Sequence, residues 1–324
     1  MKRREFIILL GGSTAAAWRL APYAFALDLP RISILHSGFP NRTPIHVLFE
    51  ELRALGYEQG RTATIELYGA EGDIGRLSTL VDQIATQKPN VIIGLTTPAA
   101  RALKHVGVTT PVVFGFVSDP IGLGIVESLA RPGANFTGVT FGDADLGGKR
   151  LELLIDALPG TKRVAVLWGR FPENALLFED ISKSASTLGI EIVSRELGGA
   201  DDLAEAFKDA AQAGAQCLIF LTDNVLFGRR KEIAELAVTN RLPSIHSFEP
   251  EVEDGGFMSY GPDISNGYRR VAALADRVLK GANPANLPVE EPTTFKLVIN
   301  LKPAKALGIT VPATLLARAD EVIE

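Results

Sequence analysis

Cysteine is almost absent from this chain of 324 residues, which contains one cysteine and four histidines. The cysteine, Cys217, lies within an apolar run, and we predict that its thiol is buried in the core. A single thiol can form no internal disulfide and no cysteine-based metal site. The histidines lack the spacing of metal ligands; they are His36, His46, His105 and His246. We therefore expect neither a bound metal nor a cofactor.

The chain also lacks the short motifs of common enzyme classes. It contains no P-loop and no nucleophile elbow, and the first strand-to-helix turn, residues 36–42, carries no glycine-rich phosphate cradle. Gly122 and Gly124 form only a fragment of a dinucleotide-binding fingerprint. We predict no catalytic residue, with an enzyme of unfamiliar motif as the alternative.

The chain has fewer basic than acidic residues. It contains 33 lysines and arginines and 38 acidic residues, so its net charge is −5. The first 26 residues hold four basic residues and one acidic residue, so the rest of the chain is more acidic still. A chain of this charge without basic clusters or a basic amphipathic stretch binds nucleic acid and membrane surfaces poorly. We expect neither as a direct partner.

The N-terminus carries the features of an export signal. Its apolar run, Phe6–Trp18, spans 13 residues, whereas a transmembrane helix needs about 20. The basic stretch Lys2–Arg4 precedes this run, and Ala24–Ala26 has the small-residue pattern of a cleavage site. We predict a signal peptide at residues 1–26, cleaved near Ala26, and a periplasmic protein without a membrane anchor. The arginine pair favours the twin-arginine route; a Sec signal and a transmembrane anchor are the alternatives.

Short apolar runs rich in valine and isoleucine alternate with longer amphipathic stretches. The runs that we predict as strands are Arg31–His36, Thr62–Tyr68, Asn90–Leu95, Pro111–Phe116, Arg163–Trp168, Ile190–Glu196, Gln216–Leu221 and Pro243–His246. Their nearly continuous hydrophobicity is typical of strands buried on both faces. A helix is predicted at Asp73–Gln87, with Asp73 as N-cap and Ile74, Leu77, Leu80, Val81 and Ile84 on its apolar face. The alternation indicates parallel sheets covered by helices on both sides.

The chain repeats its own pattern at an offset near 130 residues. Pro111 and Pro243 each open a predicted strand, and an acidic residue followed by proline comes after each strand, at Asp119 and at Glu249. A period this long is not that of a solenoid. The repeat instead favours two similar α/β lobes.

Ligand sites in open α/β sheets lie at the carboxyl ends of the strands, and two facing sheets form a cleft between lobes. The side chains that follow the strands of the first lobe are Ser37, Gly38, Phe39, Thr96, Thr97, Ser118 and Asp119. Those of the second lobe are Trp168, Arg170, Asp223, Asn224, Ser247, Phe248 and Glu249, and Tyr260 follows at a crossing between lobes. We predict that these residues bind a small molecule.

Each candidate also has a purely structural interpretation. Ser37 and Thr97 would donate to a ligand carboxylate at a helix N-terminus, or they form a turn and an N-cap. Asp119, as a buried carboxylate facing the cleft, would pair with a ligand ammonium or hydroxyl, or it shapes a turn. Asp223 would do the same in the second lobe or cap a helix. The aromatic candidates would stack on a flat or apolar solute, or belong to the core.

Longer phrases resemble a known family. They are Ser118–Val139, Gly255–Gly261, Phe295–Lys302 and Leu315–Glu324, together with Gly56–Tyr57 and the arginine pair of the leader. Over the whole mature chain the sequence resembles the ABC-transporter substrate-binding family that includes tryptophan- and tyrosine-binding transport proteins. The resemblance implies two Rossmann-like lobes in the type I periplasmic-binding-protein fold, with an interlobe cleft and three crossovers.

The resemblance also places the lobes and the crossovers along the chain. The first lobe would hold residues 27–141 and 262–287, and the second lobe residues 142–261 and 288–324. The crossovers would lie near Phe141–Gly142, Tyr260–Gly261 and Pro288–Pro292, with a helix at residues 264–280 in the first lobe and the strand Phe295–Asn300 in the second.

The function implied is that of a solute receptor for an ABC importer. Such a protein would bind a small polar or amphipathic solute, with an amino acid or a related carboxylate among the candidates, and dock as a closed monomer on an inner-membrane ABC permease. A periplasmic sensor that presents its solute to a membrane receptor is the alternative, and an enzyme on the same fold is a further one. The turns Trp168–Asn174 and Thr222–Asn224 depart from the family's usual residues, so the resemblance does not identify the ligand.

Overall fold

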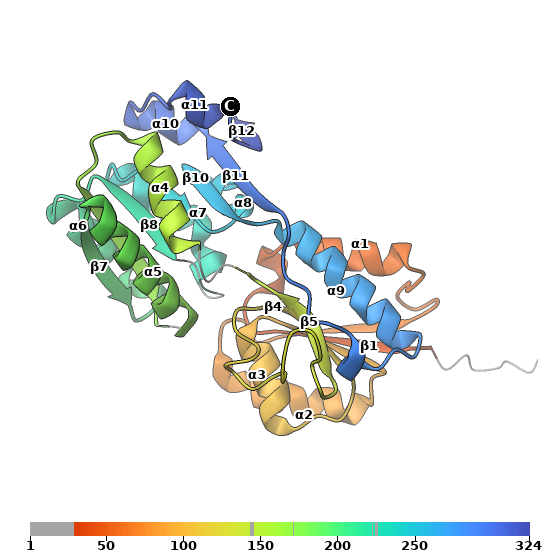
Figure 1. Ribbon diagram of the computed structural model, residues 1–324. Helices are drawn as coiled ribbons and strands as arrows, with labels where there is room; N and C mark the ends of the chain where they lie inside the picture. The colour runs from red at the N-terminus through yellow and green to blue at the C-terminus, as the bar shows by residue number, and fades with distance from the viewer. Residues whose placement is uncertain (1–28, 143–145, 171, 222, 224–225) are drawn as a thin grey trace, which may run out of the picture.

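The computed structural model describes residues 29–142, 146–170, 172–221, 223 and 226–324, and these residues form two sheets of α/β structure (Figure 1). The predicted signal peptide lies outside the described residues. Within them, no helix is long and apolar enough to cross a membrane.

The first sheet has five parallel strands in the order β2-β1-β3-β4-β5. Its strands are β1 (Arg31–His36), β2 (Thr64–Gly69), β3 (Val91–Leu95), β4 (Val112–Val117) and β5 (Phe136–Thr140). Helices α1 (His46–Ala54) and α9 (Ile264–Leu279) share one hydrophobic core with the sheet, and α2 (Leu77–Gln87) and α3 (Thr97–Val106) share the other. The sheet therefore has a helical layer on each face (Figure 1).

The second sheet has seven strands in the order β12-β11-β10-β9-β8-β6-β7. They are β6 (Arg163–Gly169), β7 (Glu191–Leu197), β8 (Cys217–Leu221), β9 (Ser244–His246), β10 (Met258–Pro262), β11 (Phe295–Asn300) and β12 (Glu321–Ile323). The pair β10–β11 is antiparallel, and the other pairs are parallel. The sheet is thus mostly parallel, in agreement with the predicted fold class.

Helices cover this second sheet too. Those of the second sheet are α4 (Gly147–Ala157), α5 (Pro172–Leu188), α6 (Leu203–Gln212), α7 (Arg230–Thr239), α8 (Glu249–Glu253), α10 (Leu301–Leu307) and α11 (Ala313–Leu316). Short 3-10 turns complete the chain: η1 (Pro40–Arg42), η2 (Ile74–Arg76), η3 (Ala200–Asp202), η4 (Leu226–Arg229) and η5 (Pro284–Asn286). Residues of α4 and α5 share one core with the sheet, and residues of α6 and α7 share another.

The internal repeat is visible in the strand order. Strands β1 to β5 are arranged in the first sheet as β6 to β10 are arranged in the second. Each unit begins with a central strand, places the next strand at one edge and adds the following three on the other side. Two similar lobes, predicted from the repeat, are therefore confirmed.

All eight predicted strands of the two sets exist, with small shifts at their ends. The expectation that all are buried on both faces is wrong for β2 and β7, which are edge strands and partly or largely exposed. The helix predicted from Asp73 is split, because residues 74–76 form a 3-10 turn that Asp73 caps through Gly75 N–H. Ile74 consequently points away from the apolar face and is 47% exposed.

Helix α9 returns to the first sheet after β10 has joined the second. It packs against α1 and against β3, β4 and β5 (Figure 1). Asp263 caps it by accepting a hydrogen bond from Asn266 N–H at 2.9 Å, and Val271, Ala272 and Ala275 on its inner face are fully buried. The chain then runs beside β5, where Glu290 N–H donates to Gly138 O at 2.9 Å, before β11 joins the second sheet.

Candidate functional site

The carboxyl ends of the two sheets contribute to one cleft. From the first lobe it is lined by residues that follow β1, β3 and β4, and from the second by Asp223, after β8, and Phe248, after β9. The cleft encloses about 820 Å³, a volume that includes space open to solvent. Clefts between lobes are a common place for small-molecule sites.

Hydroxyl groups and a helix N-terminus form the polar wall of the first lobe. The Ser37 and Thr96 hydroxyls lie 2.7 Å apart in a hydrogen bond, and both side chains are buried. Thr96 has a φ of 90° and precedes α3, whose first residue, Thr97, also lines the cleft. The partial positive charge of a helix N-terminus favours negatively charged groups. This wall therefore offers neutral donors to a ligand carboxylate.

His36 is a further polar group of this wall, at the end of β1. Its Nδ1 accepts a hydrogen bond from Gly38 N–H at 3.0 Å, so Nδ1 carries no proton and Nε2 carries the proton of the neutral ring. Burial lowers the pKa of His36 from 6.5 to about 4. The side chain is thus an uncharged donor at neutral pH.

Aromatic rings form a continuous series from one lobe to the other. Phe116 meets Tyr268 edge-on at 4.7 Å and lies 5.4 Å from Phe141. Phe141 stacks on Phe248 of the second lobe at 5.4 Å, and Phe248 meets Phe227 edge-on at 6.1 Å. All five rings line the cleft. Such a surface suits a flat or apolar solute, which gains both buried area and ring contacts.

Asp223 places a carboxylate on the second-lobe side of the cleft. It accepts a hydrogen bond from Leu226 N–H at 2.9 Å, which orients it at the start of η4. A Cβ atom at Gly169 would lie 2.1 Å from Asp223 Oδ2, so the carboxylate packs against the glycine that ends β6. Beside it, the buried Asn174 donates to Gly169 O at 3.2 Å and lines the cleft.

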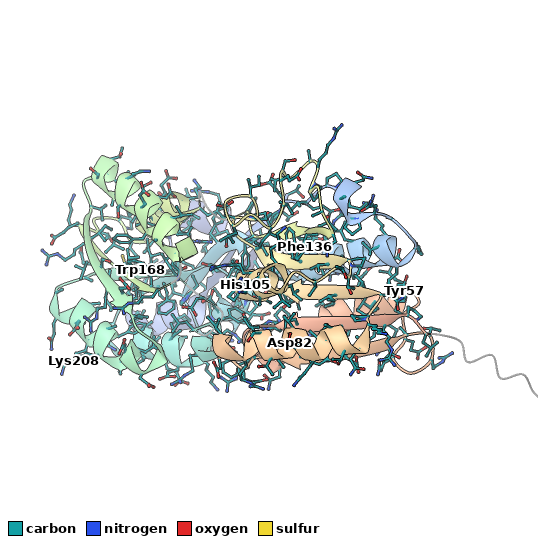
Figure 2. All side chains as sticks on the ribbon, turned by 90° about the horizontal axis from the view of Figure 1, so that it is seen from below. Tyr57, Asp82, His105, Phe136, Trp168 and Lys208 are labelled. Carbon is teal, nitrogen blue, oxygen red and sulfur yellow. The ribbon has the colours of Figure 1, made fainter. Side chains whose placement is uncertain are left out.

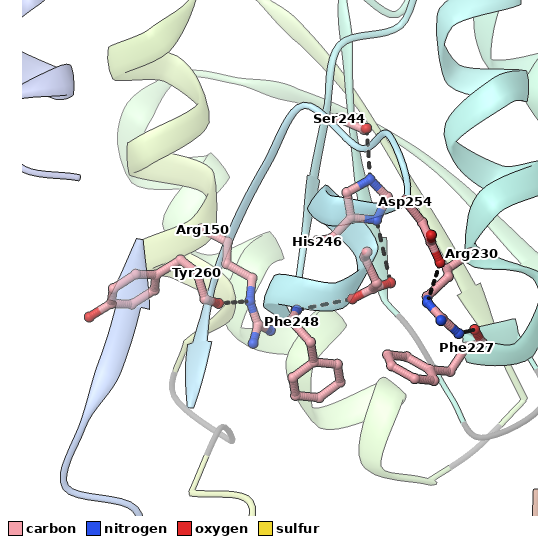
Figure 3. Close-up of polar contacts among 9 residues, drawn as sticks. Arg150, Phe227, Arg230, Ser244, His246, Phe248, Asp254 and Tyr260 are labelled. Atoms are coloured by element: carbon pink, nitrogen blue, oxygen red, sulfur yellow. Dashed lines mark hydrogen bonds and ion pairs between the residues drawn. The ribbon is translucent and has the colours of Figure 1, made fainter. Parts of the chain in front are cut away.

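Buried polar side chains hold the backbone of Phe248 in place, as Figure 3 shows. Phe248 N–H donates to Glu251 at 3.0 Å, and the other carboxylate oxygen of Glu251 lies 3.4 Å from His246 Nδ1. His246 Nε2 in turn hydrogen-bonds Ser244 at 2.8 Å. These contacts hold the loop between β9 and α8 and so fix the Phe248 backbone at the cleft.

The two lobes also touch directly beside the cleft. Arg42 Nη1 donates to Gly228 O at 2.8 Å, and Arg230 Nη1 donates back to Arg42 O at 2.7 Å. Arg230 also pairs with Asp254 at 2.8 Å and lies over the Phe227 ring (Figure 3). This interlobe clasp, formed by Arg42, Gly228 and Arg230, joins η1 to η4 and α7.

Five of the predicted ligand residues line the cleft: Thr96, Thr97, Ser118, Asp223 and Phe248. Ser37 and Gly38 lie directly behind it, because they hydrogen-bond Thr96 and His36. Asn224 lies outside the described residues. The structure thus brings together candidates from both lobes, and their contact with a ligand stays a prediction.

Asp119 does not have the surroundings that we expected. It is exposed instead of buried, and its carboxylate accepts a hydrogen bond from Gly122 N–H at 2.8 Å. The turn-shaping interpretation therefore describes its conformation, since an aspartate before proline closes a turn on its own backbone. Its role toward a ligand stays untested.

The remaining candidates make contacts outside the lining of the cleft. Trp168 lies in the second lobe (Figure 2), where it stacks on Phe178 at 5.2 Å and donates to Ser194. Arg170 is ion-paired with Glu196. Three more candidates have partners of their own: the Phe39 ring lies under the Arg42 guanidinium, Glu249 pairs with Lys296, and the Tyr260 ring stacks on Phe295. Ser247 is buried with its carbonyl oxygen against Gly261.

Sequence analysis missed several lining residues, namely His36, Phe116, Phe141, Asn174, Phe227 and Tyr268. His36 and Phe116 lie at the carboxyl ends of β1 and β4, so the strand-end rule could have found them. Tyr268 comes from a helix whose return to the first lobe was expected, but the strand-end rule does not point to side chains on a helix. Among the described residues, no group of three or more histidine, cysteine, aspartate or glutamate side chains could hold a metal ion.

Comparisons with known proteins identify related sequences and structures. The family model "ABC transporter substrate binding protein" matches residues 43–323. A tyrosine-binding protein of Clostridioides difficile is 25% identical over 255 residues, which cover 78% of this chain and 73% of that protein.

Solved structures agree. A conserved domain protein of Vibrio cholerae is 27% identical, with a TM-score of 0.84, and covers 91% of this chain and 100% of its own. An ABC domain from Streptococcus pneumonia in complex with L-Trp is 26% identical, with a TM-score of 0.82 and the same coverage. These neighbours share the two-lobed fold described above. The chain belongs to the ABC transporter substrate binding protein family.

Proposed function

We propose that this protein is the exported solute receptor of an ABC importer and that its ligand is an amino acid with an aromatic or large apolar side chain. The observation that carries the proposal is the cleft itself. Aromatic rings from both lobes line it, together with polar groups that favour an anion on one side and a cation on the other. One side offers neutral donors at the start of α3, and the other side offers the Asp223 carboxylate.

The charges of the cleft favour a zwitterion. In the described part of the chain, the lining contains Asp223 but no lysine or arginine side chain. A ligand ammonium would pair with Asp223, because it is the carboxylate on the lining of the cleft and its charge attracts a cation. A ligand carboxylate would accept hydrogen bonds from Thr96, Thr97 and the Nε2–H of His36. The known ligands of the two relatives, tyrosine and L-Trp, have this chemistry.

The same geometry supports the proposed delivery to a permease. The interlobe clasp and the Phe141–Phe248 stack tie the lobes together across the cleft. A ligand bound between the lobes would add contacts to both and favour the closed form, which the permease would recognise. Export through the predicted signal peptide would put the receptor in the periplasm. There it would bind the solute as a monomer and leave it chemically unchanged.

Isothermal titration of the mature chain, residues 27–324, tests the ligand class. The panel holds L-tyrosine, L-tryptophan, L-phenylalanine and L-leucine, the amine-free acid 3-phenylpropionate, and the carboxylate-free amine tyramine. We expect the amino acids to bind, and both truncated compounds to bind at least tenfold more weakly.

The Asp223→Asn variant separates the two ends of the ligand. It keeps an oxygen for the Leu226 N–H and removes the charge, so we expect about a 10–100-fold loss for the amino acids, the range of a charged hydrogen bond, and little change for 3-phenylpropionate. Asp119→Asn is the matched control, because Asp119 also follows a strand and accepts a hydrogen bond from the N–H three residues on, but does not line the cleft. Equal losses in both variants, or none in Asp223→Asn, would contradict the assigned pairing.

Uptake tests the transport role. Deleting the gene should abolish import of the ligand found by titration, and the full chain should restore import whereas Asp223→Asn should not. Recovery of that ligand unchanged after long incubation with the protein is expected for a receptor. Import that is unaffected by the deletion would refute the importer assignment.

A further inference from the structure

A second cavity lies beside the ligand cleft, on the side of the chain crossovers. Its walls are the end of β5, the first turn of α9 and residues 290–294. It encloses about 1060 Å³, a volume that includes space open to solvent. We call it the crossover cavity.

The crossover cavity differs from the ligand cleft in its chemistry. Arg270 and Glu290 line it as an ion pair at 2.6 Å, and Glu291 lines it as well. Thr140, a residue only 4% exposed, also lines this cavity, and its buried hydroxyl has no hydrogen-bond partner within the described structure. Together with Glu291 and the Arg270–Glu290 pair it gives the cavity a polar wall, which suits a polar group supplied by a ligand or by water.

Two residues, Phe116 and Phe141, line both cavities. Their ring centroids are 5.4 Å apart. The two rings therefore form an aromatic partition between the apolar cleft and the polar crossover cavity.

The chain holds the Phe116 ring in this place by several independent means. Phe116 has a φ of 62°, in the left-handed region that non-glycine residues seldom adopt, and the pairing of β4 with β5 shifts register between Gly115 and Val117. A Cβ atom at Gly267 would lie 2.5 Å from the Phe116 ring, so the first turn of α9 leaves a notch for it. Tyr268 supports the ring edge-on at 4.7 Å.

We propose that Phe116 and Phe141 are specificity-determining residues that limit the length of the ligand by closing the cleft against the crossover cavity. This inference rests on the proposed function, because it concerns which amino acids the same cleft accepts. A single amino acid ends at the partition. An amino acid carrying a polar extension needs the volume behind it, where the extension would meet Thr140 and the Arg270–Glu290 pair.

The test compares ligands that are extended at each end in turn. L-Tyrosine is the parent, O-(2-hydroxyethyl)-L-tyrosine extends the ring end, glycyl-L-tyrosine the amine end, and L-tyrosylglycine the carboxylate end. Each is titrated calorimetrically against the wild-type chain and against Phe116→Gly, which removes the ring and suits the positive φ. Phe141→Ala removes the other ring and serves as a second variant. Phe227→Ala is the matched control, because Phe227 lines the ligand cleft but not the crossover cavity.

We expect wild-type protein to bind every extended compound at least tenfold more weakly than L-tyrosine. Phe116→Gly or Phe141→Ala should bring at least one extended compound to within threefold of the parent, and Phe227→Ala should not. Thermal melting confirms that each variant is folded. The proposal is overturned if the folded partition variants bind L-tyrosine and gain no extended compound, or if Phe227→Ala gains the same ones. Wild-type protein that binds neither L-tyrosine nor any other amino acid would instead refute the proposed ligand class.

Discussion

The buried His36 makes the stability of the first lobe depend on pH in a way that can be calculated. The neutral ring accepts a hydrogen bond from Gly38 N–H, and protonation would break this bond and place a charge in a buried site. Burial lowers the pKa of His36 from 6.5 to about 4. Between these two values the unfolded chain binds a proton at this residue and the folded chain does not, so acid favours unfolding.

The magnitude follows from the two pKa values. The contribution of His36 is fully present above pH 6.5 and is lost as the pH falls toward 4. A shift of this size corresponds to about 3 kcal/mol in total, most of which is lost by pH 4.5. Below pH 4 both states are protonated at this residue, and its contribution changes no further.

Urea unfolding at pH 7.5, 6.5, 5.5 and 4.5 measures this effect when the wild type is compared with His36→Asn. The amide oxygen that the substitution introduces can accept from Gly38 N–H but does not titrate. All other groups titrate alike in both proteins, so the difference in free energy of unfolding isolates His36. We expect that difference to move by about 2–3 kcal/mol in favour of the variant from pH 7.5 to 4.5. Parallel curves for the two proteins would show that His36 is not held neutral by burial.

Further predictions concern the core, the cleft and the contact between lobes. Cys217→Ser should lower the free energy of unfolding by about 1–3 kcal/mol, because it buries a hydroxyl at a site where burial raises the pKa of the thiol to about 12. Ligand affinity should stay within twofold, and a large affinity loss in a folded variant would place Cys217 near the site. Gly169→Ala should weaken amino-acid binding in calorimetry more than it lowers the melting temperature, because the new Cβ would displace the Asp223 carboxylate; unchanged affinity would argue against a role for Asp223. Arg42→Ala should speed ligand dissociation in stopped-flow measurements, since it removes a 2.8 Å interlobe bond to Gly228 O; an unchanged dissociation rate would mean that the clasp does not hold the closed form.

The sheets were predictable because their central strands are continuous apolar runs. Strand β1 has the residues that the apolar pattern predicted, and strand β11 and the start of helix α9 lie where the family resemblance placed them. The exposure of the edge strands was harder to predict. Strands β2 and β7 have the composition of buried strands, although each has a neighbouring strand on one side only. A crossing between lobes was expected near Tyr260–Gly261; these residues belong to strand β10, which pairs with β9 and β11. Pairing of this kind depends on partners distant in sequence.

The candidate site was predictable to the level of strand ends and no further. The rule pointed to Thr97, Asp223 and Phe248, which line the cleft. It did not distinguish Asp223 from Asp119, because both follow strands and both carboxylates accept a hydrogen bond from the N–H three residues on; only the position of each turn decides that Asp223 lines the cleft and Asp119 does not. The aromatic partition could not be predicted either, since it depends on a positive φ at Phe116 and on the absence of a side chain at Gly267.

The return of α9 to the first sheet has a consequence for how the chain is made. Tyr268, Val271 and Ala275 complete the core that β1 to β5 begin more than a hundred residues earlier. A nascent chain that ends at β5 therefore leaves exposed the part of one sheet face that α9 covers, and the lobe that is synthesised first cannot complete its core until the segment through Leu279 has emerged. Contacts this distant in sequence form slowly. The first lobe would thus stay open to chaperones and to the export machinery for most of synthesis, while strands β6 to β9 already have all their neighbouring helices.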